Sequence, residues 1–280
     1  MKRKKSIKYK TLLCITFAVF VVGTTTALIS YHLNKLRLKK TYIESTISVM
    51  DVTHNYLEDK LTNLYQTSLA IYSSTVFDIM YQDQFDYKDF NKIKSVLQSY
   101  CEDSDVLQTY LWSSNLKYSF LANKNATFTY QTEKPNKSIK VLEDRQIAFV
   151  PLRKSDYYDY SLMKSIAYDT LTGSEDVITF MRTLYPIHGK KEAPIGVMAF
   201  DIKASLFFNA MSILYSKGID DLYIVANGTE IIADVADSPV DINKFETANA
   251  TGNPVIETSN GTLIFFDKIM VGDMRFDVYK

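Results

Sequence analysis

Hydrophobic and polar positions follow three successive patterns along the chain, and each pattern predicts a different kind of structure. Thr11 to Tyr31 is a run of 21 consecutive uncharged residues, enough at about 1.5 Å per residue to cross a hydrocarbon layer of about 30 Å as a helix. From Ile43 to Ile71 apolar residues recur at alternating intervals of three and four, without Pro or Gly. This spacing predicts a long helix from about Leu36 to Met80. Beyond Glu102 the period changes to two, which is typical of β-strands.

The apolar seam of the long helix contains two polar residues. Its positions fit the a and d sites of four heptads, and they are Ile43, Ile47, Met50, His54, Leu57, Leu61, Leu64, Ser68 and Ile71. Such a seam forms either a coiled coil with a second copy of the chain or one face of a helix that covers a sheet in the same chain. The spacing fits both, so a homodimer contact and intrachain packing stand as alternatives.

The remaining elements are predicted from shorter patterns. A second helix is expected from Tyr87 to Tyr100, where apolar residues fall on one face. Apolar runs between polar turns then predict strands over Leu107–Trp112, Leu116–Leu121, Phe128–Tyr130, Ile147–Pro151, Val177–Tyr185 and Ile195–Ile202. A short helix is expected from Ser205 to a C-terminal Gly218. Hairpins are expected at Asn227-Gly228 and Asn260-Gly261, and a last strand over Phe276–Tyr279.

One strand, turn and strand layout occurs twice. YLWSSNLKYSF and LYIVANGTEII share it about 110 residues apart, which predicts two similar α+β modules in tandem. The predicted organisation, in chain order, is a basic tail over 1–10, a transmembrane helix over 11–31, a stalk helix over 36–80, a membrane-distal module over 81–204 and a membrane-proximal module over 205–280.

Charge is unevenly divided between the two ends of the chain. Residues 1–40 hold ten lysines and arginines and no acid, whereas the rest holds 22 basic and 32 acidic residues, a net charge of −10. Basic residues ahead of a membrane span favour a cytoplasmic N-terminus, so the body is predicted to be extracytoplasmic. A cleavable signal peptide is the alternative, although the apolar stretch is long and lacks an A-x-A site. Because so acidic a body repels phosphate, nucleic-acid binding is not expected.

The sequence lacks the common motifs of enzymes and metal sites. Cys14 lies in the predicted span and Cys101 in the body, so no disulfide between them is expected. The three histidines are far apart, and neither HExxH, GxGxxG, GxxxxGK[ST] nor GxSxG occurs. We therefore expect no enzyme activity from these residues, no metal and no cofactor.

Three segments carry a resemblance to a known family. They are YLEDKLTNLYQTSLAIYSS (Tyr56–Ser74), the strand pair within Ile178–Ile202 and LYIVANGTEII (Leu222–Ile232). Together with the basic tail, the span and the long helix, they resemble a double Cache domain, an extracytoplasmic sensor built from two PAS-like modules. They look most similar to the sensor regions of YesM-like histidine kinases and of membrane-anchored AraC-type regulators from Gram-positive bacteria.

The resemblance implies an α+β fold with two antiparallel PAS-like sheets. It also implies that the 280 residues are the input half of a membrane receptor, most like that of a sensor histidine kinase, whose output module would follow a second span. Chemoreceptors and cyclic-dinucleotide cyclases carry similar input domains. A membrane-tethered adhesion or cell-wall-binding module without signal output is a separate alternative.

In the resembling family a small extracellular solute binds the distal module, against the sheet and beneath a loop rich in aromatic and charged residues. The segment Arg153–Tyr160 is similar to that loop. Aromatic faces with one polar tip and an arginine that can hold a carboxylate suit a small polar ligand. For Asp201 a helix-capping role is the alternative. The candidate binding residues are Trp112, Tyr130, Arg153, Tyr157, Tyr158, Asp176, Arg182 and Asp201.

Overall fold

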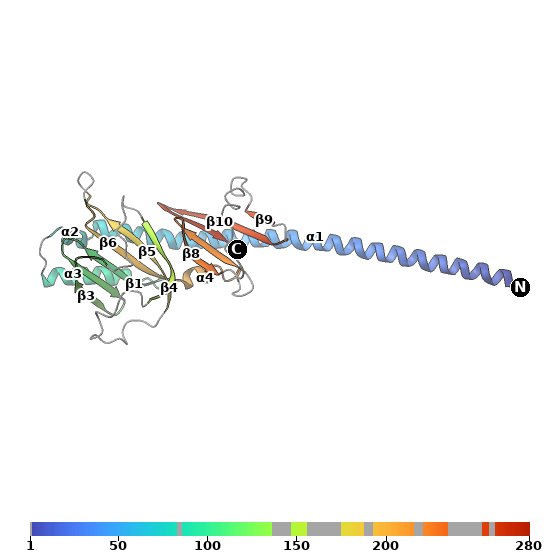
Figure 1. Ribbon diagram of the computed structural model, residues 1–280, viewed down its shortest axis with the longest axis horizontal. Coiled ribbons are helices and arrows are strands. Elements are labelled where there is room, and N and C mark those ends of the chain that lie inside the picture. Colours follow the sequence, from blue (N-terminus) through green and yellow to red (C-terminus); the bar gives the residue numbers. More distant parts are fainter. Residues whose placement is uncertain are drawn as a thin grey trace. The chain divides into compact units, whose positions relative to one another are not determined.

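The fold is taken from a computed structural model of the chain (Figure 1). It describes residues 2–82, 86–135, 147–155, 175–187, 193–215, 221–234, 254–257 and 261–280. The chain divides into two compact units, residues 1–49 and 50–280, and helix α1 (Lys2–Ala70) belongs to both.

In the first unit α1 has the character of a membrane helix. Large apolar side chains such as Leu12, Phe17 and Phe20 are exposed along it. Thr16 donates its hydroxyl to the carbonyl of Leu12 four residues earlier, and Thr24 and Thr25 make the same kind of bond. Such bonds satisfy hydroxyl groups inside an apolar medium. Within the described residues, α1 is the one helix with the length and composition to cross a membrane.

In the second unit the helix buries its apolar seam. Met50, Leu57, Leu61, Leu64, Ser68 and Ile71 are all buried by residues of their own chain. Of the two alternatives for the seam, intrachain packing is therefore correct from Met50 onward. The amphipathic pattern stabilises this helix because the apolar face leaves water as it covers the sheets.

The predicted helix to Met80 is interrupted. Helix α1 ends at Ala70, a short 3-10 turn follows over Ile71–Ser73, and α2 covers Thr75–Met80. Ser73 and Ser74 donate their hydroxyls to the carbonyls of Ala70 and Ile71. These local bonds compete with the helical ones and favour a break, although the apolar spacing continues. Helix α3 (Tyr87–Tyr100) has the predicted bounds and begins with a capping box formed by Asp86 and Asp89.

The distal module is built on a six-stranded antiparallel sheet in the order β3-β2-β1-β6-β5-β4. Its strands are β1 (Val106–Ser113), β2 (Tyr118–Asn123), β3 (Thr127–Gln131), β4 (Ile147–Lys154), β5 (Asp176–Leu184) and β6 (Gly196–Lys203). On one face, the helix face, Phe120 lies 6.3 Å from Phe90 of α3 and Phe200 lies 5.9 Å from Tyr100, measured between ring centroids.

The opposite face of this sheet, here called the site face, carries a second cluster. Tyr110, Trp112, Leu121, Phe128, Met181, Val197 and Ala199 pack together there. Successive side chains of a strand point to opposite faces, and both faces of this sheet are covered. Strands β1, β5 and β6 therefore bury nearly every residue, and their sequences are nearly continuous apolar runs.

The proximal module has a five-stranded antiparallel sheet in the order β8-β7-β11-β10-β9. Its elements are α4 (Ser205–Ala210), β7 (Leu222–Ala226), β8 (Thr229–Asp234), β9 (Val255–Glu257), β10 (Leu263–Val271) and β11 (Met274–Tyr279). Asn227 and Gly228 have φ angles of +47° and +77°, as expected of the turn in a tight hairpin. Strands β9 and β10 pair as predicted, although Asn260 lies outside the described residues.

Two predictions in this module need correction. The helix from Ser205 ends at Ala210 and continues as turns to Leu214, whereas Gly218 lies outside the described residues. The turn through Gly272 that joins β10 to β11 was not predicted, and β11 begins at Met274, two residues before the expected last strand. The two sheets also touch, because the ring of Phe149 on β4 packs edge-on at 5.2 Å against Phe276 on β11.

Candidate functional site

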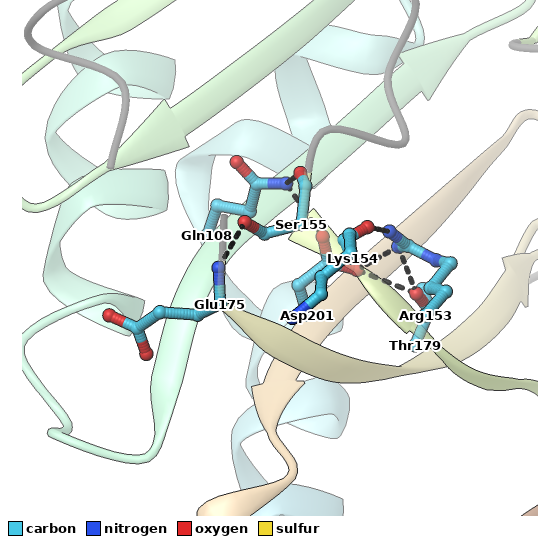
Figure 2. Close-up of polar contacts among 7 residues, drawn as sticks. All are labelled: Gln108, Arg153, Lys154, Ser155, Glu175, Thr179 and Asp201. Atoms are coloured by element: carbon cyan, nitrogen blue, oxygen red, sulfur yellow. Dashed lines mark hydrogen bonds and ion pairs between the residues drawn. The ribbon is translucent and has the colours of Figure 1, made fainter. Parts of the chain in front are cut away.

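Four polar side chains meet at one end of the site face of the distal sheet. Gln108 of β1 pairs in register with Asp201 of β6, which pairs with Thr179 of β5, so the three side chains lie side by side. Arg153 reaches them from β4, after an irregularity between Val150 and Arg153 that shifts the strand register. Figure 2 shows these side chains pointing toward one another.

The carboxylate of Asp201 is the centre of this polar cluster. Oδ1 accepts hydrogen bonds from Arg153 Nη2 and Thr179 Oγ1, both at 2.6 Å, and Oδ2 accepts one from Gln108 Nε2 at 2.6 Å. Arg153 Nη2 also donates to Thr179 Oγ1. Asp201 is completely buried, whereas Arg153 is mostly buried.

Burial raises the pKa of the Asp201 carboxyl, because leaving water disfavours its charged form. The Arg153 guanidinium, the Thr179 hydroxyl and the Gln108 amide act in the opposite direction, since all three stabilise the carboxylate. A buried charge persists only when it is paired and hydrogen-bonded in this way. The position of Arg153 is therefore fixed by the requirements of Asp201.

Ser155 connects the cluster to Glu175, the residue just before β5. Its carbonyl accepts from Gln108 Nε2 at 3.2 Å, and its Oγ accepts from the amide of Glu175 at 3.1 Å. The amide of Ser155 donates to the carbonyl of Glu175 at 2.8 Å. Ser155, the last described residue of the predicted loop Arg153–Tyr160, is thus bonded to the cluster through Gln108 (Figure 2). Tyr157 and Tyr158 lie outside the described residues.

The aromatic candidates lie farther along the same face. Trp112 is 7% exposed and belongs to the cluster on the site face, against which Tyr130 packs. The hydroxyls of Tyr110 and Ser119 are hydrogen-bonded to each other at 2.8 Å. The indole Nε1 of Trp112 is buried and has no acceptor among the described residues. A buried donor of this kind is unusual and favours an acceptor supplied from elsewhere.

Two candidates lie away from this face cluster. Asp176 at the start of β5 forms an exposed ion pair with Lys154 at 2.8 Å. Arg182 projects from the helix face, where its Nε donates to Ser68 Oγ of α1 at 3.0 Å. The capping role considered for Asp201 is wrong, because Asp201 lies within β6 and the N-cap of α4 is Ala204.

Sequence reasoning missed Gln108 and Thr179, and it included Ser155 only as part of the loop Arg153–Tyr160. A buried aspartate in an apolar strand must have partners, and antiparallel pairing of the two predicted strands would have placed Thr179 opposite Asp201. Gln108 depended on knowing that β1 pairs with β6, a contact between distant segments. In the part of the chain that the structure describes, no group of three or more His, Cys, Asp or Glu side chains is placed to hold a metal ion.

Comparisons with known proteins give likeness in structure only. No protein-family model and no curated protein matches the sequence. The sensory domain of the Campylobacter jejuni chemoreceptor Tlp3 has a TM-score of 0.51 at 17% identity, over 88% of this chain and 96% of that one. The same domain with isoleucine bound gives 0.50 at 16% identity, over 88% and 95% of the two chains. The extracellular domain of the histidine kinase soHK1S-Z6 gives 0.51 at 13% identity, over 88% and 96%.

The chain has the double Cache fold. The order of elements decides this: a long N-terminal helix is followed by two antiparallel sheet modules, and the similar domains are covered almost completely. The α+β class predicted from the sequence is confirmed. In double Cache terms, the polar cluster lies in the distal module, on the sheet face opposite the helices.

Proposed function

We propose that this double Cache chain is the extracytoplasmic ligand-sensing region of a bacterial transmembrane signalling receptor. The observation that carries the proposal is the site face of the distal sheet. It combines a buried Arg153–Asp201 ion pair with Trp112, whose indole N–H has no acceptor among the described residues. A few placed polar groups beside aromatic walls are what small-molecule sites require.

The ligand is a small extracellular solute with at least one acceptor oxygen or nitrogen. That acceptor pairs with the Trp112 indole, and an apolar or planar part of the ligand packs on the neighbouring rings. The Arg153–Asp201 pair offers a second contact, because a ligand with its own charge can exchange partners with either member. The Tlp3 sensory domain, with isoleucine bound, gives one ligand class to test.

The output class is the finer part of the proposal. The segments that resemble YesM-like kinases and AraC-type regulators, together with the likeness to a kinase extracellular domain, favour a sensor histidine kinase. The likeness to Tlp3 supports a chemoreceptor equally well on structural grounds. Membrane attachment through residues 11–31 and an extracytoplasmic body belong to the same proposal.

Ligand binding is tested by thermal unfolding of the full chain in detergent with a panel of small solutes. The panel starts with L-isoleucine and adds other amino acids, dicarboxylates and sugars. A ligand that binds only the folded state raises the melting temperature, and the increase grows with the logarithm of one plus the ratio of the ligand concentration to Kd. We expect at least one such solute.

The substitution Trp112→Phe should reduce that ligand's affinity about tenfold, since it removes the indole N–H but keeps an aromatic ring. The matched control is Tyr87→Phe, which removes a polar tip from an exposed ring on α3. Unchanged affinity in Trp112→Phe would contradict the assignment of the site, and a panel without any stabilising solute would contradict the sensing function.

A further inference from the structure

Arg182 is a buried cation that the candidate site does not use. Its side chain is 4% exposed on the helix face of the distal sheet. Its Nε donates to Ser68 Oγ, and its guanidinium lies over the ring of Tyr65 at 5.0 Å from the ring centroid. Its Nη2 is buried and has no hydrogen-bond partner among the described residues. No ion pair to Arg182 is found in the described part of the chain.

Three parts of the chain meet at this arginine. Tyr65 and Ser68 belong to α1, and Arg182 belongs to β5 of the distal sheet. The Tyr65 ring also lies against Gly272, in the turn between β10 and β11 of the proximal sheet. A β-carbon at residue 272 would come within 2.3 Å of Tyr65 Cζ. The stalk helix, the distal sheet and the proximal hairpin are therefore in contact through one pair of side chains.

The hydrogen bonds at this junction are incomplete. The Ser68 hydroxyl donates to the carbonyl of Tyr65 at 2.7 Å, so toward Arg182 it acts as an acceptor. The guanidinium thus has one hydroxyl and one aromatic face as partners, and a buried donor remains unpaired. An unpaired buried donor costs free energy. A second arrangement, in which Nη2 gains an acceptor, would recover that free energy. The junction is therefore suited to switch between two arrangements.

Strand β5 links this junction to the polar cluster. Thr179, which binds Asp201, and Arg182 are three residues apart on the same strand and project from opposite faces. At about 3.3 Å per residue this separation is about 10 Å. Strand β5 is hydrogen-bonded on both sides, to β4 and β6, so it moves as a stiff element.

We propose that Arg182 is the contact through which the state of the distal polar cluster reaches the stalk helix and the proximal hairpin. This inference rests on the proposed sensing function and names its route of regulation. Rearrangement of the Asp201 cluster shifts β5, and the shift changes the hold of Arg182 on Ser68 and Tyr65. Because Tyr65 fills the space beside Gly272, the proximal turn moves with it.

The proposal is tested without a ligand, by hydrogen exchange of the full chain in detergent. Asp201→Asn perturbs the cluster, and exchange is measured in residues 61–70 of α1 and 269–276 of the proximal turn. Exchange in residues 87–100 of α3, which have no described contact with Asp201, normalises for any global loss of stability. In the otherwise unchanged protein we expect the reporter segments to change about fivefold, at the low end of coupling between sites. In the Arg182→Met background the change should fall below about twofold.

Lys60→Met provides the matched control. Lys60 also connects α1 to the distal module, through an ion pair with Asp105 at 2.6 Å, but it does not contact the proximal turn in any described interaction. The response to Asp201→Asn should persist in this background. If Arg182→Met does not fold, Ser68→Ala removes the acceptor alone and should reduce the response at least by half.

Three results would overturn the proposal. The first is that Asp201→Asn changes hydrogen exchange in the reporter segments equally with and without Arg182→Met or Ser68→Ala. The second is that Asp201→Asn changes nothing there in the otherwise unchanged protein. The third is that Lys60→Met abolishes the change as well. Because no solute is used, failure of this experiment leaves ligand binding untouched. A failed solute screen likewise leaves the coupling measurable.

Discussion

Asp201 illustrates how a single residue determines the chemistry around it. A carboxylate without solvent contact in the middle of an apolar strand is stable only with donors on both oxygens, and Arg153, Thr179 and Gln108 supply them. Removal of one partner of a buried pair is strongly destabilising, because the remaining charge is left uncompensated. This asymmetry gives a direct test of the site geometry.

We expect Arg153→Met to lower the free energy of unfolding by about 3–5 kcal/mol. The double variant Arg153→Met, Asp201→Asn should recover most of this loss, since no buried charge remains. Lys154→Met is the control at an exposed neighbour. Urea unfolding followed by the fluorescence of Trp112, the chain's single tryptophan, measures all four proteins. A loss below about 1 kcal/mol would contradict the buried ion pair.

The direction in which the stability of Arg153→Met changes with pH follows from the pKa of Asp201. Burial already raises the pKa of Asp201 above its ordinary value of 3.8, and loss of the guanidinium raises it further. The folded state then binds a proton more tightly than the unfolded state, so stability falls as pH rises through that window. Relative to the original protein, Arg153→Met should therefore be less unstable at pH 5 than at pH 7.

Individual residues were only partly predictable. The chemistry of Asp201, Arg153, Trp112 and Tyr130 indicates a binding role, and the structure places the four side chains on one face. The chemistry of Arg182 indicates the same role, but its side chain projects from the other face, because successive residues of a strand point to opposite faces. Gln108 and Thr179 have common side chains, and only the strand pairing distinguishes them from surface residues.

At the scale of elements, the heptad seam of α1 is the informative case. Its two polar positions, His54 and Ser68, have partners in the sheets rather than in a second helix. His54 Nδ1 lies 3.0 Å from Asp267 Oδ2 of β10, and Ser68 binds Arg182 of β5. The a and d spacing alone could not reveal this, because coiled coils and sheet-covering helices share it.

The homodimer remains a prediction, and the structure moves it to the outer surface of α1. Leu57 is 1% exposed, whereas Val52 and Tyr56 are 67% and 44% exposed. With Cys14 replaced by Ser, cysteine at Tyr56 should therefore crosslink between two copies in the membrane far better than cysteine at Leu57. Non-reducing gels measure the yield. Equal yields at the two positions would contradict a contact through this surface.

Element boundaries were predictable where local chemistry marked them. The period of apolar residues predicted α3, and the Asn-Gly pair predicted the β7–β8 hairpin. The break after Ala70 was missed because the apolar spacing continues through it, while two serine hydroxyls favour the break. Strand β4 continues past Pro151 because the register shifts there, and a proline is tolerated at such an irregularity.

At the scale of the whole molecule, sequence repetition predicted the tandem arrangement of two sheets. Hairpins could be predicted because their two strands are neighbours in the sequence. The pairing of β1 with β6 could not, because these strands are far apart in the chain. How each strand joins its sheet depends on contacts between distant residues, and a single sequence does not display them.

The membrane orientation is a prediction for the intact protein. With ten basic residues and no acid in residues 1–40, the body should face the outside of the cell. Protease added to intact cells should remove an epitope fused after Lys280 and leave one fused before Met1. Full protection of the C-terminal epitope would contradict an extracytoplasmic sensor.

The contact between Phe149 and Phe276 has a consequence for building hybrid receptors. Phe276 also lies 6.3 Å from Phe207 of α4, so residues of both modules share one aromatic cluster. A recombination junction near residue 204 would divide that cluster and leave each half with exposed rings. Both modules should therefore be exchanged together with the adjoining part of α1, and the module boundary visible in the sequence is an unsuitable place to cut.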